Sequence, residues 1–380
     1  MISEKFSKIQ PSETLAINAK AKELKEKGLQ VINFSVGEPD FNSPENVKQA
    51  TINAIQENFT RYTAADGIKE LREKISEKFL KDNSLEYSPE QIVVSNGAKQ
   101  ALYNSLMALC SKGDEIIIPA PFWVSYTAMA YLCEAKLVIT SNPSLKITSE
   151  EFENSITKKT KALLLNSPSN PTGLMYSKKE LEALAEIAVK KNVFVLSDEV
   201  YEKIVFDEKH YSIASFNDEI KNLTITINGV SKSYAMTGYR IGYSASNPEL
   251  AKALKKIQSH STGSACSFSQ KAALEALNSD EIQLKKQVQE FKKRRDFIAS
   301  ELKNTKIKFI LPQGAFYYFF NLKEITSDDV KFCSDLLEKK FVALVPGTPF
   351  GMSGYARMSY ACSLEEIKEG LKRIKEFIEN

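Results

Sequence analysis

Short apolar runs alternate with amphipathic helical segments between about residue 45 and residue 245. The runs are almost continuously apolar, which is typical of strands buried on both faces of a parallel sheet. In such sheets ligands bind beyond the strand ends, at the connecting loops. The pattern predicts an α/β fold with a mostly parallel sheet covered by helices. Its strands are expected at residues 92–94, 115–118, 162–165, 193–196, 223–227 and 241–244.

Capping residues mark several helix starts. Ser177 with Glu180, and Ser363 with Glu366, show the capping-box pattern, in which each pair satisfies two free backbone N–H groups. The first pair opens a helix expected to end near residue 190, and the second opens the C-terminal helix. A further helix is expected over residues 11–28, where Pro and Ser stand at the start and Gly at the end.

The chain changes character after a charged helical stretch at residues 281–303. Aromatic-rich strands follow, which favours a second, smaller α+β domain closed by the C-terminal helix. We therefore expect a large domain over 46–285 and a small domain made of 1–45 and 286–380. Strands of the small domain are expected at residues 31–36, 315–320, 341–345 and 357–360.

Composition and charge narrow the classes of function. The 380 residues are 43% hydrophobic and 26% charged, with a formal net charge of +3, so no strong field points to nucleic acid or a membrane surface. The five cysteines are scattered without a CxxC pair, which favours neither a disulfide framework nor a metal site. No apolar run approaches the roughly 18 residues of a membrane span. We expect a cytoplasmic protein.

Arginine is scarce in this chain, with seven arginines among 51 basic residues. Its planar fork binds carboxylate or phosphate through two hydrogen bonds, which lysine cannot imitate. Arg240 and Arg357 are therefore candidate anion ligands, although a solvated surface position is the ordinary explanation for any single arginine.

Polar and glycine residues gather at the expected strand ends. Gly97, Ala98 and Lys99 follow the strand at 92–94 and open a helix, so free N–H groups there can cradle a phosphate. Trp123, the only tryptophan, lies in a proline-containing loop where it can stack on a flat ring or simply fill the core.

The later strand ends show the same feature. Asn170 lies in an Asn-Pro-Thr-Gly turn that turn chemistry alone can explain. Asp198 and Tyr201 close an apolar strand, where the aspartate either caps the next segment or faces a ligand. Ser231 and Lys232 follow the strand at 223–227.

Together these residues fit one kind of chemistry. Schiff-base formation needs a partly deprotonated amine, which a desolvated lysine near other cations supplies, and Lys232 has Arg240 nearby in sequence. A pyridine cofactor that acts as an electron sink needs a carboxylate at its ring nitrogen, and Asp198 fits that role. Asn170 and Tyr201 can donate hydrogen bonds to the ring oxygen of such a cofactor.

The sequence resembles a known family at seven motifs that occur in order from about residue 11 to the C-terminus. They are SVGEPDF, NGAKQAL, PFWVSY, NSPSNPTG, LSDEVYE, NGVSKSYAMTGYRIGY and YARMSYA. This set resembles the class I and II aminotransferases of the type I fold that use pyridoxal 5'-phosphate. It is most similar to the bacterial aspartate aminotransferase subgroup that includes aspartate/prephenate enzymes.

The resemblance implies a role for each matched residue. Lys232 would hold the cofactor and shuttle a proton, Asp198 would pair with its ring nitrogen, and Tyr201 would bind its ring oxygen. Arg357 would clamp the α-carboxylate of an amino acid or 2-oxo acid substrate. The further implied cofactor contacts are Gly97, Ala98, Lys99, Trp123, Asn170, Ser231 and Arg240, and the further substrate contacts are Gly37, Trp123 and Asn170. Tyr62 would reach the partner's phosphate in a homodimer.

The sequence leaves the identity of the substrate open. Gln10 stands where prephenate-active members of the subgroup carry lysine, which argues against prephenate, and Ser12 and Thr14 are possible side-chain contacts. Alternatives within the fold are an alanine, aromatic or kynurenine aminotransferase, or a β-lyase. A Rossmann nucleotide-binding module is disfavoured because no GxGxxG opens the first βα unit. A PLP-fold regulator would need a DNA-binding segment, and none is found before residue 11.

Overall fold

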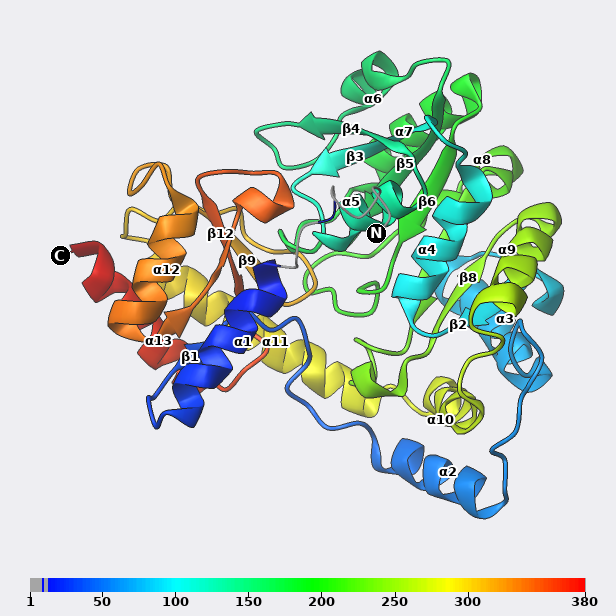
Figure 1. The fold of residues 1–380 in the computed structure, drawn as a ribbon, viewed down its shortest axis with the longest axis horizontal. Helices are drawn as coiled ribbons and strands as arrows, with labels where there is room; N and C mark the ends of the chain where they lie inside the picture. Colours follow the sequence, from blue (N-terminus) through cyan, green and yellow to red (C-terminus); the bar gives the residue numbers. More distant parts are fainter. Residues whose placement is uncertain (1–8, 10–12, 380) are drawn as a thin grey trace, which may run out of the picture.

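The computed structural model describes residue 9 and residues 13–379, so Gln10, Pro11 and Ser12 lie outside the described residues. Figure 1 shows two bodies side by side, a larger one with a broad sheet and a smaller one that contains both the N-terminal helix and the C-terminal helix. Helix α11 (Ile282–Leu302) runs from one body into the other. The smaller body is therefore built from segments distant in sequence, whereas the elements of the larger body follow one another along the chain from α2 (Glu45–Gln56) to α10 (Ser267–Asn278).

The larger body contains a seven-stranded sheet in the order β2-β8-β7-β6-β5-β3-β4. Strand β8 runs antiparallel to both of its neighbours, and the pairs β3–β4, β3–β5, β5–β6 and β6–β7 are parallel. The predicted mostly parallel α/β sheet is thus confirmed. Its strands are β2 (Ile92–Ser95), β3 (Glu115–Ala120), β4 (Lys136–Ser141), β5 (Thr160–Asn166), β6 (Phe194–Asp198), β7 (Thr224–Gly229) and β8 (Gly242–Ala245).

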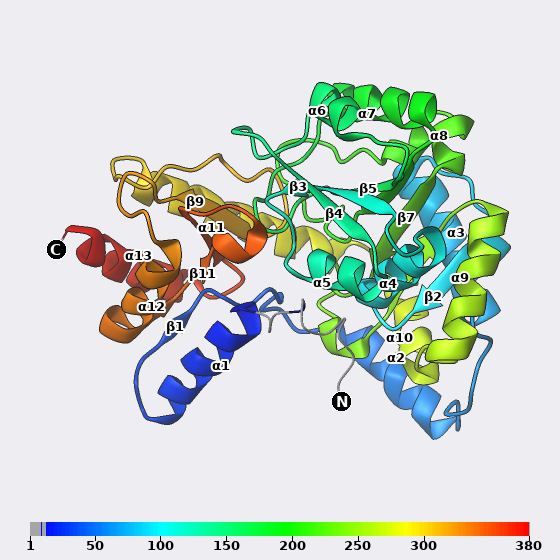
Figure 2. The ribbon, with the colours of Figure 1, turned by 45° about the horizontal axis from the view of Figure 1, so that its top comes forward.

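Helices cover both faces of this sheet (Figure 2). On one face α4, α5 and α9 pack against alternate strand residues, and on the other α6 to α8, α3 and α10 do so, because neighbouring strand side chains point to opposite faces. The helices are α2 (Glu45–Gln56), α3 (Lys69–Asn83), α4 (Ala98–Leu109), α5 (Ser125–Leu132), α6 (Ser149–Ser155), α7 (Lys178–Lys191), α8 (Asp218–Asn222), α9 (Pro248–Ser261) and α10 (Ser267–Asn278). Single 3₁₀ turns occupy Pro89–Gln91, Ile213–Ser215, Thr237–Tyr239 and Thr348–Phe350.

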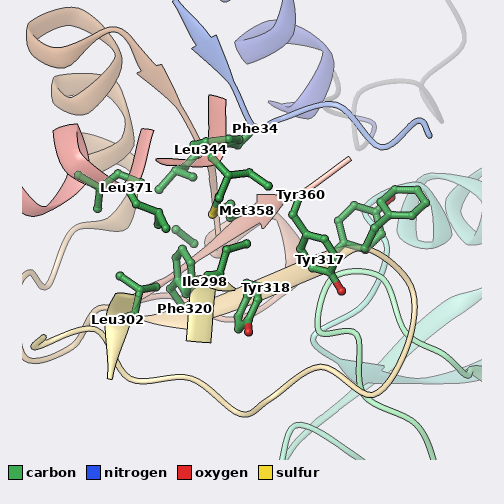
Figure 3. Close-up of a cluster of buried hydrophobic side chains, with 14 of the residues drawn as sticks. Phe34, Ile298, Leu302, Tyr317, Tyr318, Phe320, Leu344, Met358, Tyr360 and Leu371 are labelled. Carbon is green, nitrogen blue, oxygen red and sulfur yellow. The ribbon is translucent and has the colours of Figure 1, made fainter. Parts of the chain in front are cut away.

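The smaller body is built on an antiparallel three-stranded sheet, β11-β12-β9, and a parallel pair, β1 with β10. Its aromatic-rich core, drawn in Figure 3, also receives residues from the loop after β6. The elements are α1 (Glu13–Glu26), β1 (Ile32–Asn33), β9 (Tyr317–Asn321), α12 (Asp329–Lys340), β10 (Val342–Ala343), β11 (Val345–Pro346), β12 (Tyr355–Ser359) and α13 (Leu364–Glu379).

Local signals in the sequence agree with the observed boundaries. The capping box of Ser177 and Glu180 opens α7, and Ser363 and Glu366 exchange the same hydrogen bonds before α13. Strand β4 was not predicted from the sequence. The expected boundary at residues 285 and 286 falls in the first turn of α11, which continues unbroken, so the division into domains stays a prediction. Among the described residues, no helix is long and apolar enough to cross a membrane.

Candidate active site

A cavity of about 350 Å³ opens where the strand-end loops of the larger sheet meet the smaller body. Most of the residues singled out in the sequence line it, although they come from eight separate stretches of chain. They are Gly37, Ala98, Lys99, Trp123, Asn170, Asp198, Tyr201, Ser231, Lys232, Arg240 and Arg357. Thr14, Leu15, Tyr126 and Tyr317 are further lining residues. The convergence follows from parallel strands, whose carboxyl ends share one edge of the sheet.

Lys232 follows β7 and projects into this cavity. Its Nζ donates a hydrogen bond to the backbone oxygen of Gly37 at 2.6 Å. Burial lowers the pKa of the ammonium group to about 8, and the charges of Arg357 and Arg240 act in the same direction against that of Glu38. A substantial share of Lys232 is therefore neutral at mildly alkaline pH, as a nucleophilic or basic amine requires.

Asp198 ends β6 and is 4% exposed. One carboxylate oxygen accepts a hydrogen bond from the Tyr126 hydroxyl at 2.6 Å, and the other accepts one from the Val200 N–H at 3.3 Å. Burial raises the pKa of the carboxyl group to about 6, although these hydrogen bonds lower it. Among the described residues no cationic side chain is bonded to the buried Asp198 carboxylate, which suits it to a cationic ligand atom.

Backbone at the start of α4 forms a glycine-lined edge of the site. Gly97 is the N-cap with φ +82°, and a Cβ there would lie 2.5 Å from the Arg240 guanidinium. A Cβ on Gly242 would lie 2.1 Å from the Ala98 nitrogen. Only glycine fits either position, so the helix N-terminus and an arginine are brought together as an anion site requires.

Arg357 on β12 is 2% exposed. Its two terminal nitrogens donate hydrogen bonds to the Asn170 side-chain oxygen at 3.0 Å and the Ser35 backbone oxygen at 2.6 Å. Its Nε is buried without a hydrogen-bond partner among the described residues, and burial lowers the pKa of the guanidinium. Because a buried guanidinium without a carboxylate is unfavourable, this arrangement favours an anionic ligand in the cavity.

Two tyrosines that sequence reasoning did not single out complete the buried wall. Tyr126 holds Asp198, and its ring lies edge-on to that of Trp123 with centroids 5.4 Å apart. The hydroxyl of Tyr317 lies 2.9 Å from that of Tyr201, whose pKa burial raises well above the ordinary value. In the sequence both looked like core aromatics on regular elements, and only their place beside loop residues distinguishes them.

Trp123 and Lys99 form a second wall of the cavity. The ammonium of Lys99 lies 4.8 Å from the centre of the indole ring, within the range of a cation–π contact. Burial, assisted by Arg240, lowers the pKa of Lys99. Only burial and Arg240 act on the pKa of Lys99, and no carboxylate among the described residues does.

Some expected site residues lie elsewhere. Tyr62 is 97% exposed and does not line the cavity of this single chain. Gln10 and Ser12 lie outside the described residues, whereas Thr14, from the first turn of α1, borders the cavity.

One cluster of possible metal ligands occurs within residues 13–379, namely Glu199, Glu202 and His210. Its acidic groups already have partners. Lys78 forms an ion pair with Glu202, and the side chains of Ser212 and His210 contact Glu199 at 2.6 and 3.2 Å. A lysine thus supplies the positive charge there, and the cluster is read as a structural ion-pair network.

Comparison with known proteins places this geometry in a family. Residues 30–374 match the family described as aminotransferase class I and II. The chain is 43% identical to an aspartate aminotransferase of Bacillus sp. (strain YM-2), covering 100% of this chain and 99% of the relative. It is 44% identical to a probable aspartate/prephenate aminotransferase of Rickettsia typhi, covering 99% and 98%.

Solved structures give the same answer. The aspartate aminotransferase from Rhizobium meliloti superposes with a TM-score of 0.96 at 41% identity, covering 100% of this chain and 99% of the other. That from Thermotoga maritima superposes with a TM-score of 0.95 at 43% identity, covering 100% of both chains. The chain belongs to the class I and II aminotransferase family and is a transaminase, which moves an amino group between an amino acid and a 2-oxo acid.

Proposed function

We propose that this transaminase uses pyridoxal 5'-phosphate held by Lys232 and acts on aspartate or glutamate, with a 2-oxo acid such as 2-oxoglutarate as acceptor. The observation that carries the proposal is the charge of the cavity. Lys99, Lys232, Arg240 and Arg357 line it, and Asp198 is the one carboxylate among its described lining residues. Such a cavity suits ligands with several negative charges, here a cofactor phosphate and a dicarboxylic acid.

The residues present fit this cofactor. The N-terminus of α4 at Gly97 and Ala98, with Ser231 and Arg240, offers N–H, hydroxyl and guanidinium donors for a phosphate. Asp198 would receive the protonated ring nitrogen, and this positive charge would stabilise the buried carboxylate. Asn170 and Tyr201 would bind the ring oxygen, and Trp123 would lie against the ring. When bound, the cofactor supplies an electron sink and a carrier for the amino group.

The chain's own residues then perform binding and proton transfer. The neutral Nζ of Lys232 removes the proton from the α-carbon of the amino acid, and a pKa near 8 places it close to the range useful for a general base. Arg357 binds the α-carboxylate through two parallel hydrogen bonds, beside Gly37 and Asn170. The buried wall formed by Tyr126, Tyr201 and Tyr317 keeps water away from this side of the cavity, which strengthens the hydrogen bonds and charge interactions there.

Lys99 supports an acidic side chain on the substrate. It is a partly desolvated cation on the same cavity as Arg357, and no carboxylate of the described chain neutralises it. The resemblance gives Lys99 to the cofactor phosphate; a second carboxylate on the substrate would add to this pairing, whereas alanine or tyrosine would not. Thr14 borders the same cavity, and its hydroxyl can donate a hydrogen bond to such a carboxylate.

We also propose a homodimer in which Tyr62 reaches the partner's phosphate. Tyr62 is 97% exposed, and Ile52 and Ile55 of α2 are 48% and 47% exposed, so these side chains are available for contact with a second subunit. Light scattering measures the mass directly. A monomer with full activity would contradict this part of the proposal.

A panel of donors and acceptors with the cofactor-loaded protein tests the function. Aspartate and glutamate should convert the visible spectrum in a half-reaction at far lower concentration than alanine or tyrosine, and prephenate is included among the acceptors. Lys232→Ala should remove the visible band and lower turnover by at least about 10³-fold, because it loses both the anchor and the base. Lys99→Met should raise KM for aspartate more than KM for alanine.

Two results would overturn the proposal. Near-normal turnover of Lys232→Ala would end its assignment as anchor and base. A wild-type enzyme that converts alanine or tyrosine but not aspartate would belong to one of the rival aminotransferase classes. Release of pyruvate and ammonia from a cysteine conjugate, which has a leaving group on its β-carbon, would place it among β-lyases.

A further inference from the structure

Tyr317 joins the two bodies at the cavity. It is the first residue of β9 in the smaller sheet and is fully buried, and its hydroxyl lies 2.9 Å from that of Tyr201, which follows β6 of the larger sheet. The centre of its ring lies 4.7 Å from the guanidinium carbon of Arg357. Tyr317 therefore contacts one candidate ligand-binding residue from each body, Tyr201 from the larger and Arg357 from the smaller.

The chain makes room for the hydroxyl of Tyr317 in particular. A Cβ built on Gly37 would lie 2.7 Å from that oxygen, but 3.7 and 3.9 Å from the next nearest atoms, which are ring carbons. Without the hydroxyl, alanine would therefore fit at position 37 with ordinary contacts. The backbone oxygen of Gly37 also accepts the hydrogen bond from Lys232, so this close approach lies within the site.

The hydrogen bond between the two hydroxyls has a direction that matters for a ligand. Each phenol has one proton, and only one proton lies between the two oxygens. If Tyr317 donates, the proton of Tyr201 is free to point into the cavity, and accepting a hydrogen bond makes Tyr201 a stronger donor. If Tyr201 donates, its proton is already used within the protein.

We propose that Tyr317 is a positioning residue for transamination: its hydroxyl turns the Tyr201 proton toward the ligand, and its ring fixes the Arg357 guanidinium. The inference rests on the proposed function, because Tyr201 and Arg357 are given their ligands there. Figure 3 shows Tyr317 at the edge of the small-body core. Tyr317 thus belongs to the core by its ring and to the site by its oxygen.

The groups that face this pair come from several elements. Tyr201 and Asp198 lie at the end of β6, Lys232 follows β7, and Arg357 stands on β12. Any change in how strongly Tyr201 donates is therefore reported by the protonation of the lysine-linked cofactor, since a hydrogen bond to the anionic ring oxygen favours the deprotonated form of the linkage.

Tyr317→Phe in the cofactor-loaded enzyme tests the proposal, with Tyr318→Phe as matched control. Tyr318 is the next residue on β9, is equally buried, and donates to the backbone oxygen of Arg295 at 2.7 Å, within the core. Tyr317→Phe should raise the apparent pKa of the visible band by up to about one unit and lower kcat/KM about 2- to 10-fold, as expected for one neutral hydrogen bond. Tyr318→Phe should lower Tm and leave the band and kcat/KM unchanged.

Gly37→Ala supplies an independent readout that needs no cofactor. In the wild-type background the new methyl group meets the Tyr317 oxygen, so Tm should fall. In the Tyr317→Phe background the nearest atom is a ring carbon at 3.7 Å, and the loss of Tm should be clearly smaller. Equal losses of Tm in both backgrounds would show that the Tyr317 hydroxyl is not the reason why glycine is needed at position 37.

The outcomes separate this inference from the proposed function. If the wild-type protein shows no visible band that Lys232→Ala removes, the proposed function fails. If that band is present and Tyr317→Phe behaves as wild type, or if both phenylalanine variants shift it equally, the positioning role of Tyr317 is overturned while the function stands.

Discussion

Asp198 and Glu202 are two buried carboxylates separated by only three residues, and they have different partners. Asp198 faces the active-site cavity and has hydrogen bonds but, within the described part of the chain, no cationic side chain bonded to it. Glu202, four positions later, forms an ion pair with Lys78 and accepts a hydrogen bond from Asn83 at 2.6 Å. Lys203 continues this ion-pair network to Asp82 and Glu281, both at 2.9 Å.

The pKa values of the two carboxyl groups move in opposite directions. Burial acts on both to raise the pKa, and at Asp198 it prevails, giving a value of about 6. At Glu202 the charges of Lys78 and His210 and the hydrogen bonds outweigh burial, and the pKa is lowered. Burial alone therefore does not distinguish a structural charge from a functional one. The distinction is whether the chain supplies the counter-charge or leaves it to a ligand.

The largest effect is expected when the ion-pair network is broken. Lys78→Met leaves Glu202 buried without its counter-charge, so the free energy of unfolding should fall by about 3–5 kcal/mol. Lys74→Met, on the same helix, is the control, because Lys74 pairs with Glu77 at 3.0 Å on the surface and should cost less than about 1 kcal/mol. Urea unfolding measures both, and equal losses would remove the contrast between the two groups.

Asp198→Asn should have the opposite sign in the cofactor-free protein. The folded carboxyl group has a pKa of about 6 against an ordinary 3.8, so its contribution to stability is present below 3.8 and lost as pH rises through 6. The variant should therefore be more stable than wild type by about 2–3 kcal/mol at pH 8, with a clearly smaller gain at pH 5.

Asp329→Asn is the control for that change. Asp329 is also buried, but it accepts hydrogen bonds from Thr348, Ser353 and Gly354 that lower its pKa. Its replacement should destabilise the protein at pH 8. If both variants lost stability, the chain itself would stabilise the Asp198 carboxylate, and the contrast with Asp329 would be wrong.

Lys232→Met sharpens the comparison from the cationic side. The folded ammonium has a pKa of about 8 against 10.5, so the unfolded chain binds the proton more tightly between these values. The shift corresponds to about 3 kcal/mol, and because the side chain is partly open to the cavity we expect a gain of about 2 kcal/mol at pH 7. The gain should shrink as pH rises from 8 to 10.5. Unfolding of the cofactor-free protein at several pH values measures it, and a pH-independent difference would contradict the assignment.

The smallest effect is expected for a replacement that keeps the charge. Arg357→Lys retains the cation but loses the planar fork, so kcat/KM should fall about 10- to 30-fold, roughly 1.4–2 kcal/mol, with KM raised. Arg373 on α13 forms an ion pair with Glu369 at 2.8 Å and does not line the cavity. Arg373→Lys should therefore leave kcat and KM unchanged. An unchanged KM for Arg357→Lys would move the carboxylate clamp to another residue.

Much of the fold followed from the hydrophobic pattern, and the exceptions have physical reasons. The runs at β5, β6 and β7 were recognisable because these strands are buried on both faces. Strand β4, at the sheet edge, has residues that are mostly half-buried or exposed, so its apolar signal is weak. Strand β1 lies within the expected stretch 31–36 but has only two residues, so its bounds are narrower than predicted.

The site was predictable where chemistry lay at strand ends. Asp198 and Lys232 stand out because a charge directly after a buried strand needs an explanation. Tyr126 and Tyr317 lie within a helix and a strand, where an aromatic residue is the expected core occupant, and only three-dimensional contacts reveal their hydroxyl partners. Tyr62 was expected to reach a partner subunit, and it stays a prediction.

Strand β1 pairs with β10, so the strand partner of Ile32 is Val342, near the C-terminus. The backbone oxygens of Ser35 and Gly37, which follow β1, accept hydrogen bonds from Arg357 and Lys232. During synthesis the larger sheet can complete its strand order once residue 245 has emerged, whereas the smaller body needs nearly the whole chain. Contacts of such long sequence separation form slowly. Because Tyr317 and Arg357 of the smaller body also line the cavity, the active site around the reactive lysine is complete only when the C-terminal strands are in place.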